Sequence, residues 1–351
     1  MHNLKIHKNF QLNEEHFSSI EELLSFSESI SENVFLFLSN WFSADDYIDV
    51  QTSGSTGAPK IIRLKKEWML NSALATGVFF NLREHTKALL CLPIGYIAGK
   101  MMLVRALVLG WEIDIIEPTA KPLKKIVKFY DFSAMIPMQL QNSLEQLHII
   151  KKVIVGGAPV SVLLQDKLQN HTTEVFATYG MTETVTHIAI KKLNNFLGNT
   201  EKTFYKIVPD VKISQDNRNC LVIDAPKVSN DIMTTNDVVR MVSNSEFEWL
   251  GRIDHVINSG GIKLHPKQIE DKMSLCITKR FFVAGIPDNL LGEKLVLVIE
   301  GAEDQFIRNQ VHNLKTLLKF EFPKEIYFIE NFIETETKKI QRTKTLSKIF
   351  H

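Results

Sequence analysis

The stretch from Thr52 to Lys60 has residue types that bind polyphosphate. Its sequence is Thr-Ser-Gly-Ser-Thr-Gly-Ala-Pro-Lys, and it lies between two short apolar runs that predict strands. Gly54 and Gly57 allow positive φ and let backbone N–H groups approach an anion, while four hydroxyls and the lysine add donors and charge. The G-x-x-x-x-G-K-[ST] loop is excluded, because Pro59 precedes the lysine. The stretch therefore predicts another kind of phosphate-binding turn, the alternative being a surface loop without a ligand.

Alternating strand and helix patterns follow this turn and would position it. Strands are expected at 88–92, 112–116, 132–136 and 153–155, and helices at 66–80, 98–109, 123–129, 139–147 and 162–168. Such alternation predicts an α/β fold with a doubly wound sheet, whose ligands lie beyond the carboxyl ends of its strands. Before the turn, an amphipathic helix is expected around Ile20, Leu23 and Leu24, and a second apolar stretch covers 34–38.

The remainder of the chain has a different pattern of apolar and polar residues. From about Thr186, short apolar alternations with turn residues predict a β-rich subdomain. The final hundred residues predict a small α+β domain, with helices at 266–273 and 305–320 and strands at 281–284, 295–299 and 326–329. With 351 residues, 44% of them hydrophobic, the chain is long enough for more than one domain.

Composition restricts the partners. The net charge of +1 gives no field to hold a nucleic acid or an anionic membrane surface, and no apolar run approaches the ~20 residues of a membrane span. Cys91, Cys220 and Cys276 lie far apart, which argues against a metal knot or disulfide frame and fits a reducing compartment. We expect a cytoplasmic protein with small-molecule partners and without nucleic acid or membrane insertion, and a homodimer is left open.

Five motifs occur in an order that resembles the acyl-adenylate-forming superfamily, which includes acyl-CoA synthetases, luciferases and peptide-synthetase adenylation domains. Besides the phosphate turn, they are Tyr179–Thr184 (similar to Y-G-x-T-E), Thr235–Asp237 (T-G-D), Gly251–Asp254 with the loop 259–266 and Ile269–Glu270, and Lys338–Arg342 (G-K-I-x-R). The resemblance implies a large N-terminal adenylation domain over 1–253, with a doubly wound mixed sheet and a β-rich subdomain. It also implies a small mobile α+β lid over 254–351.

By this resemblance the protein is an AMP-forming acid–thiol ligase that uses ATP, Mg²⁺ and CoA. Adenylation needs alignment and charge neutralisation at the α-phosphate more than acid–base work. The β- and γ-phosphates would be held by Thr52, Ser53, Gly54, Ser55, Thr56, Gly57 and Lys60. Thr182 would bond the α-phosphate and Glu183 would carry Mg²⁺. Lys339 would neutralise the acyl carboxylate and the α-phosphate oxygens.

The resemblance also assigns the nucleoside and the lid. The adenine slot would be formed by Gly156, Gly157, Ala158, Tyr179 and Gly180. Asp237 would accept the ribose hydroxyls and Arg252 would bond the ribose and phosphate side. Rotation at the hinge residue Asp254 would withdraw Lys339 and bring Gly260 and Gly261 over a tunnel for the CoA thiol.

Three features depart from the family pattern. Lys338 stands where the family has Gly, Asn236 replaces the Gly of T-G-D, and only 51 residues precede the phosphate turn. Asn is tolerable at such a position because it also visits left-handed conformations. The shortened front and Lys338 keep open a non-catalytic nucleotide-binding homologue.

The segment 92–107 is similar to the acyl-pocket helix of o-succinylbenzoate:CoA ligases of menaquinone biosynthesis, which implies an acyl pocket containing Tyr96, Lys100 and Arg105. One carboxylate of o-succinylbenzoate is activated, and the other needs a cation if it is enclosed. Arg105 or Lys100 could supply it, the alternative being that Arg105 lies on a helix face exposed to water. Another aryl- or acyl-CoA ligase, or a stand-alone adenylating enzyme, remains the alternative within enzymes.

Overall fold

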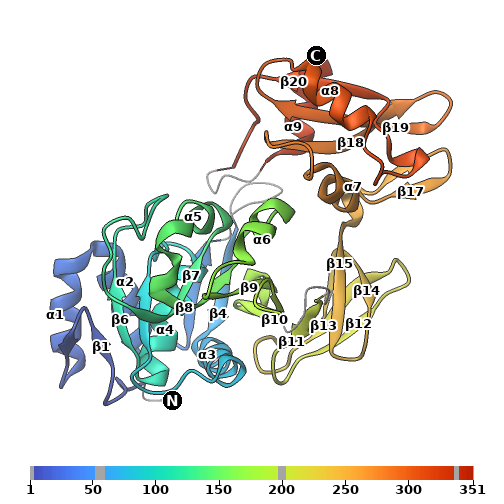
Figure 1. Ribbon diagram of the computed structural model, residues 1–351. Coiled ribbons are helices and arrows are strands. Elements are labelled where there is room, and N and C mark those ends of the chain that lie inside the picture. Colours follow the sequence, from blue (N-terminus) through green and yellow to red (C-terminus); the bar gives the residue numbers. More distant parts are fainter. Residues whose placement is uncertain (1–3, 52–59, 197–202, 336–339, 351) are drawn as a thin grey trace.

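The computed structural model describes residues 4–51, 60–196, 203–335 and 340–350. They form a large body, which continues into a β-rich part ending with β15 (Glu246–Arg252), and a smaller C-terminal body, whose helix α7 (Pro266–Met273) contacts β15 (Figure 1). The phosphate turn at 52–59 and the predicted catalytic Lys339 lie outside the described residues.

Within the described ranges, 13 strands form one mixed sheet in the order β12-β13-β14-β15-β11-β10-β9-β8-β7-β5-β6-β1-β2. The central part from β1 to β9 is parallel, whereas β10 to β15 pair antiparallel. Besides β15, the strands of this sheet are β1 (Gln11–Leu12), β2 (Glu15–His16), β5 (Lys87–Leu90), β6 (Glu112–Ile115), β7 (Tyr130–Met135), β8 (Ile150–Val155), β9 (Glu174–Gly180), β10 (His187–Lys192), β11 (Tyr205–Ile207), β12 (Lys212–Gln215), β13 (Cys220–Asp224) and β14 (Met233–Met241).

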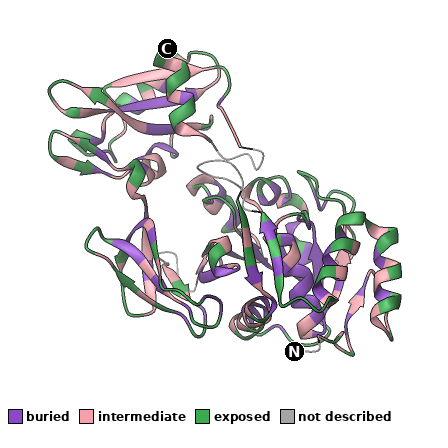
Figure 2. Cartoon of the chain, turned by 180° about the vertical axis from the view of Figure 1, so that it is seen from behind, coloured by how far each residue is buried: buried purple, intermediate pink, exposed green. Residues whose placement is uncertain are grey.

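Helices cover both faces of the parallel part, as a doubly wound sheet requires. One face packs on α1 (Ile20–Ile30), α2 (Glu32–Phe42), α3 (Lys66–Phe80) and α4 (Ile97–Leu109), and the other on α5 (Pro137–Gln141), the 3₁₀ helix η1 (Leu144–Ile149) and α6 (Val162–Leu168). Alternate residues of the strands face the two cores: Leu90 and Ile154 one of them, Leu89 and Val153 the other. Figure 2 shows that the buried parts of the chain are concentrated in the large body. The predicted fold class is confirmed.

Helix α4 is buried on nearly all sides. Every residue from Met101 to Leu107 is buried, and the helix packs against α3. A helix that is apolar all round belongs in a core, which explains why α4 lies between α3 and the sheet. Arg105, the one charged residue between Met101 and Leu107, therefore lies in the core.

The C-terminal body has its own sheet, in the order β17-β16-β19-β18 with β20 paired to β19. Its elements are β16 (Ile257–Ser259), β17 (Ile262–Leu264), β18 (Phe281–Asp288), β19 (Gly292–Glu300), α8 (Gln305–His312), the 3₁₀ helix η4 (Lys319–Glu321), β20 (Glu325–Ile329) and α9 (Arg342–Phe350). The large sheet ends at Arg252 and this sheet begins at Ile257, with a short 3₁₀ helix, η3 (Ile253–His255), between them. The functional division into an adenylation domain and a lid stays a prediction.

Three sequence predictions of helices are wrong in part or whole. Residues 123–129 form only turns, because Lys128 reaches across to Asp114 and Glu14 at 2.7 and 2.8 Å and the chain then enters β7. The helix expected at 139–147 is divided into α5 and η1. The helix expected at 305–320 ends at His312, because the following turns bury Leu317 in the C-terminal core.

The cysteines are free thiols, as their spacing predicts. Cys91 and Cys220 are buried, and Cys276 is partly buried. Burial raises the pKa of the Cys91 thiol to about 12. In addition, none of the helices in the described ranges has the length and apolar character needed to span a membrane.

Candidate functional site

The predicted adenine-slot residues lie together at the carboxyl ends of two neighbouring parallel strands. Gly156, Gly157 and Ala158 follow β8, while Tyr179 and Gly180 end β9, which pairs with β8. Position 156 has no room for a side chain, because a Cβ there would lie 2.6 Å from Thr178 Oγ1. The backbone of this turn therefore passes close to β9, at the edge where an α/β sheet binds its ligands.

Asp237 is held at this edge by two side chains. It lies in β14 opposite Arg252 of β15 and is 8% exposed. The Tyr179 hydroxyl donates to its Oδ2 at 2.6 Å, and the Trp249 indole donates to its Oδ1 at 3.0 Å. Burial and the adjacent carboxylate raise the pKa of Tyr179 far above its usual value, so Tyr179 stays a donor. Each carboxylate oxygen keeps further lone-pair capacity, which suits a pair of ribose hydroxyls.

A polar network joins Arg252 to the predicted hinge. Arg252 Nη2 forms an ion pair with Asp254 Oδ2 at 2.8 Å. Asn236 Nδ2 donates to the same carboxylate at 3.3 and 3.4 Å, and Asn236 Oδ1 accepts from Arg218 Nη1 at 3.2 Å. Asn236, where the family pattern has Gly, thus connects β14 with the segment that leaves the large sheet. A glycine could not make these contacts.

Thr182 and Glu183 lie in the 3₁₀ helix η2 (Thr182–Thr184), directly after β9. The strand β4 (Ile61–Lys65) starts one residue after Lys60, pairs with β3 (Tyr47–Gln51) and contacts η2. The chain leaving the phosphate turn is thereby brought to the Thr182–Glu183 segment. Glu183 is exposed and forms no ion pair with any residue of the described part of the chain.

Arg105 lies in a polar cluster inside the large body. It is 2% exposed, its Nε donates to Thr76 Oγ1 at 3.1 Å, and its Nη2 donates to Thr186 Oγ1 at 3.4 Å. The cluster also contains Ser72, whose hydroxyl is 2.8 Å from Thr186 Oγ1, and His187, whose Nε2 is 3.3 Å from Thr76 Oγ1. The alternative that Arg105 faces water is therefore wrong.

The electrostatics of this cluster are unusual, because its partners are uncharged. In the part of the chain that the structure describes, Arg105 has no carboxylate partner. Burial alone lowers its pKa to about 9. Burial, followed by the Arg105 charge, holds the pKa of His187 well below its usual value, so the imidazole is neutral. In the described residues, the Arg105 guanidinium thus lies among hydroxyls and a neutral imidazole rather than beside a carboxylate.

Lys100 is engaged differently from Arg105. Its Nζ donates to the carbonyls of Ile94 and Gly95 at 2.8 and 3.1 Å and lies 5.7 Å from the centre of the Phe37 ring. Burial lowers its pKa. Tyr96, the third predicted acyl-pocket residue, is half-buried and directly precedes α4.

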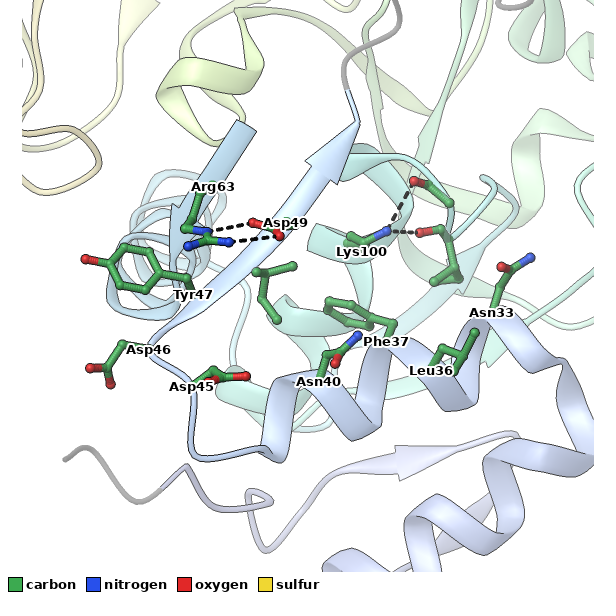
Figure 3. Close-up of a pocket in the computed structure, with 13 residues that line it drawn as sticks. Asn33, Leu36, Phe37, Asn40, Asp45, Asp46, Tyr47, Asp49, Arg63 and Lys100 are labelled. Carbon is green, nitrogen blue, oxygen red and sulfur yellow. Dashed lines mark hydrogen bonds and ion pairs between the residues drawn. The ribbon is translucent and has the colours of Figure 1, made fainter. Parts of the chain in front are cut away.

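Figure 3 shows a pocket of about 370 Å³ between α2, the β3–β4 hairpin and the turn before α4. Among the described residues predicted to act in the site, Lys100 is the one that lines it. Asp49 and Arg63, which face each other across the hairpin, form two bonds of 2.9 and 3.3 Å on its wall. The pocket thus includes none of the described nucleotide-binding candidates.

Gly260 and Gly261 form the tip of the β16–β17 hairpin. Their φ angles are +59° and +79°, which a two-residue turn with both central residues left-handed requires. The prediction placed these glycines in a loop over a CoA tunnel. The described elements put them in the C-terminal sheet, and their role toward CoA stays a prediction.

Several residues of the site escaped the sequence analysis, namely Ser72, Thr76, Thr186, His187 and Trp249. A signal existed for the first two, since they are polar residues four apart on the buried face of α3. Arg105 itself stands in an otherwise apolar run, and the absence of a polar face on that helix predicts burial.

Comparisons with known proteins agree with the fold and the motifs. Residues 20–220 match the family model described as AMP-binding enzyme. An acyl-CoA synthetase (AMP-forming)/AMP-acid ligase II-like protein from Dyadobacter fermentans has a crystal structure with 39% sequence identity and a TM-score of 0.60, and the match covers 90% of this chain and 93% of that chain.

Two further relatives are named for one substrate. A 2-succinylbenzoate–CoA ligase from Staphylococcus aureus is 26% identical, over 88% of this chain and 68% of the relative. The o-succinylbenzoate coenzyme A synthetase of Bacillus subtilis, solved with ATP and a magnesium ion, is 16% identical with a TM-score of 0.69, over 95% of this chain and 83% of that chain. At that identity the likeness supports the fold alone.

The family match spans more than half of the chain, and the Dyadobacter structure matches nearly its whole length. The predicted enzyme class, an AMP-forming acyl-CoA ligase, is confirmed at the level of the family. The chain belongs to the AMP-binding enzyme family, within the acyl-adenylate-forming superfamily, and is similar to 2-succinylbenzoate–CoA ligases.

Proposed function

We propose that this enzyme joins o-succinylbenzoate to CoA in two half-reactions. In the first, a carboxylate of the acid attacks the α-phosphate of ATP and pyrophosphate leaves. In the second, the CoA thiol attacks the acyl carbonyl and AMP leaves, so that a thioester, AMP and pyrophosphate are formed from one acid, one ATP and one CoA. The observation that carries the proposal is the buried Arg105 with its hydroxyl partners.

A dicarboxylic acid explains why a cation is buried at this position. A buried charge without a charged partner is costly, and a carboxylate ligand offsets that cost through charge-assisted hydrogen bonds. Arg105 lies in α4, within the segment similar to the acyl-pocket helix of o-succinylbenzoate:CoA ligases, and bonds Thr186, four residues after Thr182. The non-reacting carboxylate would bind at Arg105, and the reacting carboxylate would be directed toward the α-phosphate near Thr182.

The nucleotide would occupy the edge formed by β8, β9, β14 and β15. Asp237, oriented by Tyr179 and Trp249, would accept the ribose hydroxyls, and Arg252 would exchange Asp254 for the ribose and phosphate side. The phosphate turn at 52–57 and Lys60 would hold the β- and γ-phosphates, and Thr182 the α-phosphate. Lys339 would neutralise the charge that develops on the α-phosphate and the acyl carboxylate.

Glu183 fits the magnesium role. It is an exposed hard oxygen donor, and the described residues contain no group of three or more His, Cys, Asp and Glu side chains that could hold a metal ion by itself. A site of one carboxylate completed by phosphate oxygens is the arrangement Mg²⁺ favours. When bound, Mg²⁺ would supply charge neutralisation on the phosphates.

For the second half-reaction, we propose rotation at Asp254 that withdraws Lys339 and carries the Gly260–Gly261 hairpin toward the acyl-adenylate. The present arrangement ties Asp254 to Arg252 and Asn236, so rotation exchanges these contacts for others. Both half-reactions would then use one active site, to which the C-terminal body contributes Lys339 in the first and the Gly260–Gly261 hairpin in the second.

The test is a panel of acids assayed in each half-reaction. Isotope exchange between pyrophosphate and ATP follows adenylation, and loss of free CoA follows thioester formation. We expect strong preference for o-succinylbenzoate over analogues in which either carboxylate is replaced by an amide. Equal use of other acids would favour a different acyl-CoA ligase, and exchange without CoA consumption a stand-alone adenylating enzyme. Absence of exchange with every acid would favour a non-catalytic nucleotide-binding homologue.

A further inference from the structure

The segment after Glu183 contains a strained turn. Val185 has φ +65° and ψ −63°, and the Thr186 N–H donates to the Thr184 carbonyl at 2.7 Å. These values define a γ-turn with positive φ, a rare conformation that is unfavourable for a β-branched residue. Strained backbone persists only where its surroundings hold it, and it is concentrated at sites that bind or switch. Hydrogen bonds and close packing hold this turn on both of its sides.

The amino-terminal side of the turn is fixed to the Thr182–Glu183 segment. Thr184 Oγ1 accepts from the Met181 N–H at 3.0 Å and lies 2.7 Å from the Thr186 carbonyl. Val185 is fully buried, and the Thr186 carbonyl lies against Gly180, where a Cβ would approach it to 2.1 Å. The backbone of Thr186 is therefore in direct contact with the segment that contains the proposed α-phosphate and magnesium residues.

The other side of the turn is fixed to the polar cluster around Arg105. Thr186 Oγ1 lies 2.8 Å from Ser72 Oγ and accepts from Arg105 Nη2 at 3.4 Å. The longer of these two contacts is the one to the guanidinium, and Arg105 is held separately by Thr76 at 3.1 Å. One threonine therefore touches the proposed carboxylate receptor through its side chain and the nucleotide segment through its backbone.

We propose that Thr186 is a positioning residue that couples binding of the acid to binding of the nucleotide, through the γ-turn at Val185. This inference rests on the proposed function. A carboxylate at Arg105 outcompetes the Thr186 hydroxyl for the guanidinium, because charge-assisted hydrogen bonds are the stronger ones. Release of Thr186 lets the strained turn relax and moves η2. Since coupling between binding sites is reciprocal, MgATP also strengthens binding of the acid.

The experiment measures this coupling by calorimetry. The probe is an ATP analogue with a methylene group between the α- and β-phosphates, so that adenylation cannot proceed, and its Kd is measured with Mg²⁺ in the absence and presence of saturating o-succinylbenzoate. In the natural protein we expect the acid to lower this Kd about tenfold, within the usual range of coupling. In Thr186→Val we expect the acid to change it less than about twofold, with the Kd in the absence of acid retained.

Two variants separate positioning from stability. Thr186→Ser keeps the hydroxyl and should keep the coupling. Thr173→Val removes another hydroxyl, which donates to the Leu147 carbonyl at 2.7 Å, and should lose comparable thermal stability while keeping the coupling. Thr186→Ala serves as a second uncoupled variant if the valine protein does not fold.

Each outcome decides the matter. Full coupling in Thr186→Val or Thr186→Ala overturns the proposal, as does binding of the acid to the natural protein without any effect on the nucleotide. In that last case the proposed function still stands, because the acid binds. Failure of o-succinylbenzoate to bind the natural protein overturns both. Loss of coupling in the valine and alanine variants, with its retention in Thr186→Ser and Thr173→Val, supports the proposal.

Discussion

Arg105 is buried and Arg342 is partly buried, and the surroundings of the two guanidinium groups differ. Arg342, at the start of α9, forms two bonds of 2.8 and 3.0 Å with the Glu270 carboxylate and lies 5.5 Å from the centre of the Phe282 ring. It also donates to the Val283 carbonyl at 3.3 Å. Arg105 donates to the hydroxyls of two threonines and has no carboxylate partner within the described residues.

Under our proposal, this difference separates a cation used for folding from one that binds a ligand. The charge of Arg342 is neutralised within the C-terminal body, where it joins α9 to α7 and β18. The charge of Arg105, by contrast, is not neutralised by any carboxylate of the described residues. Since an uncompensated buried charge costs stability, its retention in a core favours a binding role.

Removing the uncompensated cation should give the largest effect. For Arg105→Gln we expect kcat/KM for o-succinylbenzoate to fall about 100-fold, because a charge-assisted pair with the acid is lost. The melting temperature should be retained or raised, since a buried unpaired charge is removed. Steady-state kinetics and thermal unfolding of the same preparation check both. Retained kinetics with a lowered melting temperature would contradict the comparison.

Removing the compensated cation should act on stability instead. Arg342→Gln leaves the partly buried Glu270 without its charge partner and should lower the free energy of unfolding by about 2 kcal/mol, below the fully buried case because both groups retain some exposure. Chemical denaturation measures this. The matched control is the double variant Glu270→Gln with Arg342→Gln, in which no unpaired charge remains and most of the loss should be restored. A single variant as stable as the natural protein would show that the pair is dispensable.

The pH dependence of adenylation should reveal the cation that lacks a partner. Only protonated Arg105 attracts a carboxylate, and its pKa is lowered to about 9, so binding is complete below that pH and is lost above it. We expect kcat/KM for o-succinylbenzoate in pyrophosphate exchange to fall about tenfold per pH unit above pH 9. This half-reaction requires no CoA, so thiol ionisation does not contribute. An analogue without the carboxylate that binds Arg105 should lack this decline, and a decline of equal slope for both acids would assign it to another group.

The smallest effect should come from the network around the predicted hinge. Asn236→Gly restores the residue of the family motif and removes the contacts to Asp254, which at 3.3 and 3.4 Å are long and exposed. We expect the ratio of the adenylation and thioester-forming rates to change about twofold. Single-turnover measurements of each half-reaction give this ratio. If both rates change by the same factor, Asn236 does not influence the proposed domain rotation.

The sequence predicted well those elements whose patterns are local. The bounds of α3, α6 and α7 were predicted at 66–80, 162–168 and 266–273 because amphipathic or apolar runs end at turn residues there. The two-residue strands β1 and β2 were missed, since they exist only through pairing with β6 and with each other. Helix α9 was also missed, because its basic residues resemble a solvated tail until Leu346 and Ile349 pack on the C-terminal sheet.

Site residues, too, were predictable where the sequence pattern that marks them is local. The motifs with fixed spacing predicted Tyr179, Asp237 and Arg252, and the structure brings them to one edge of the sheet. Their partner Trp249 and the cluster around Arg105 come from strands and helices far apart in the chain, and the four-residue spacing of Ser72 and Thr76 indicates a buried polar pair but not its contact with Arg105. The burial of Arg105 could have been predicted from the apolar character of α4, whereas the hydroxyls that surround it depend on how α3 and β10 pack against that helix.

The high pKa of Cys91 bears on the chemistry of an activated acyl group. This thiol directly follows β5 and precedes the Pro93–Gly99 turn, and burial raises its pKa to about 12, so it stays protonated. It packs in the core shared with α5 and α6, on the face of the sheet opposite α4, the helix that carries Arg105. A protonated thiol behind the sheet would therefore not compete with CoA for the acyl group in the reaction that we propose.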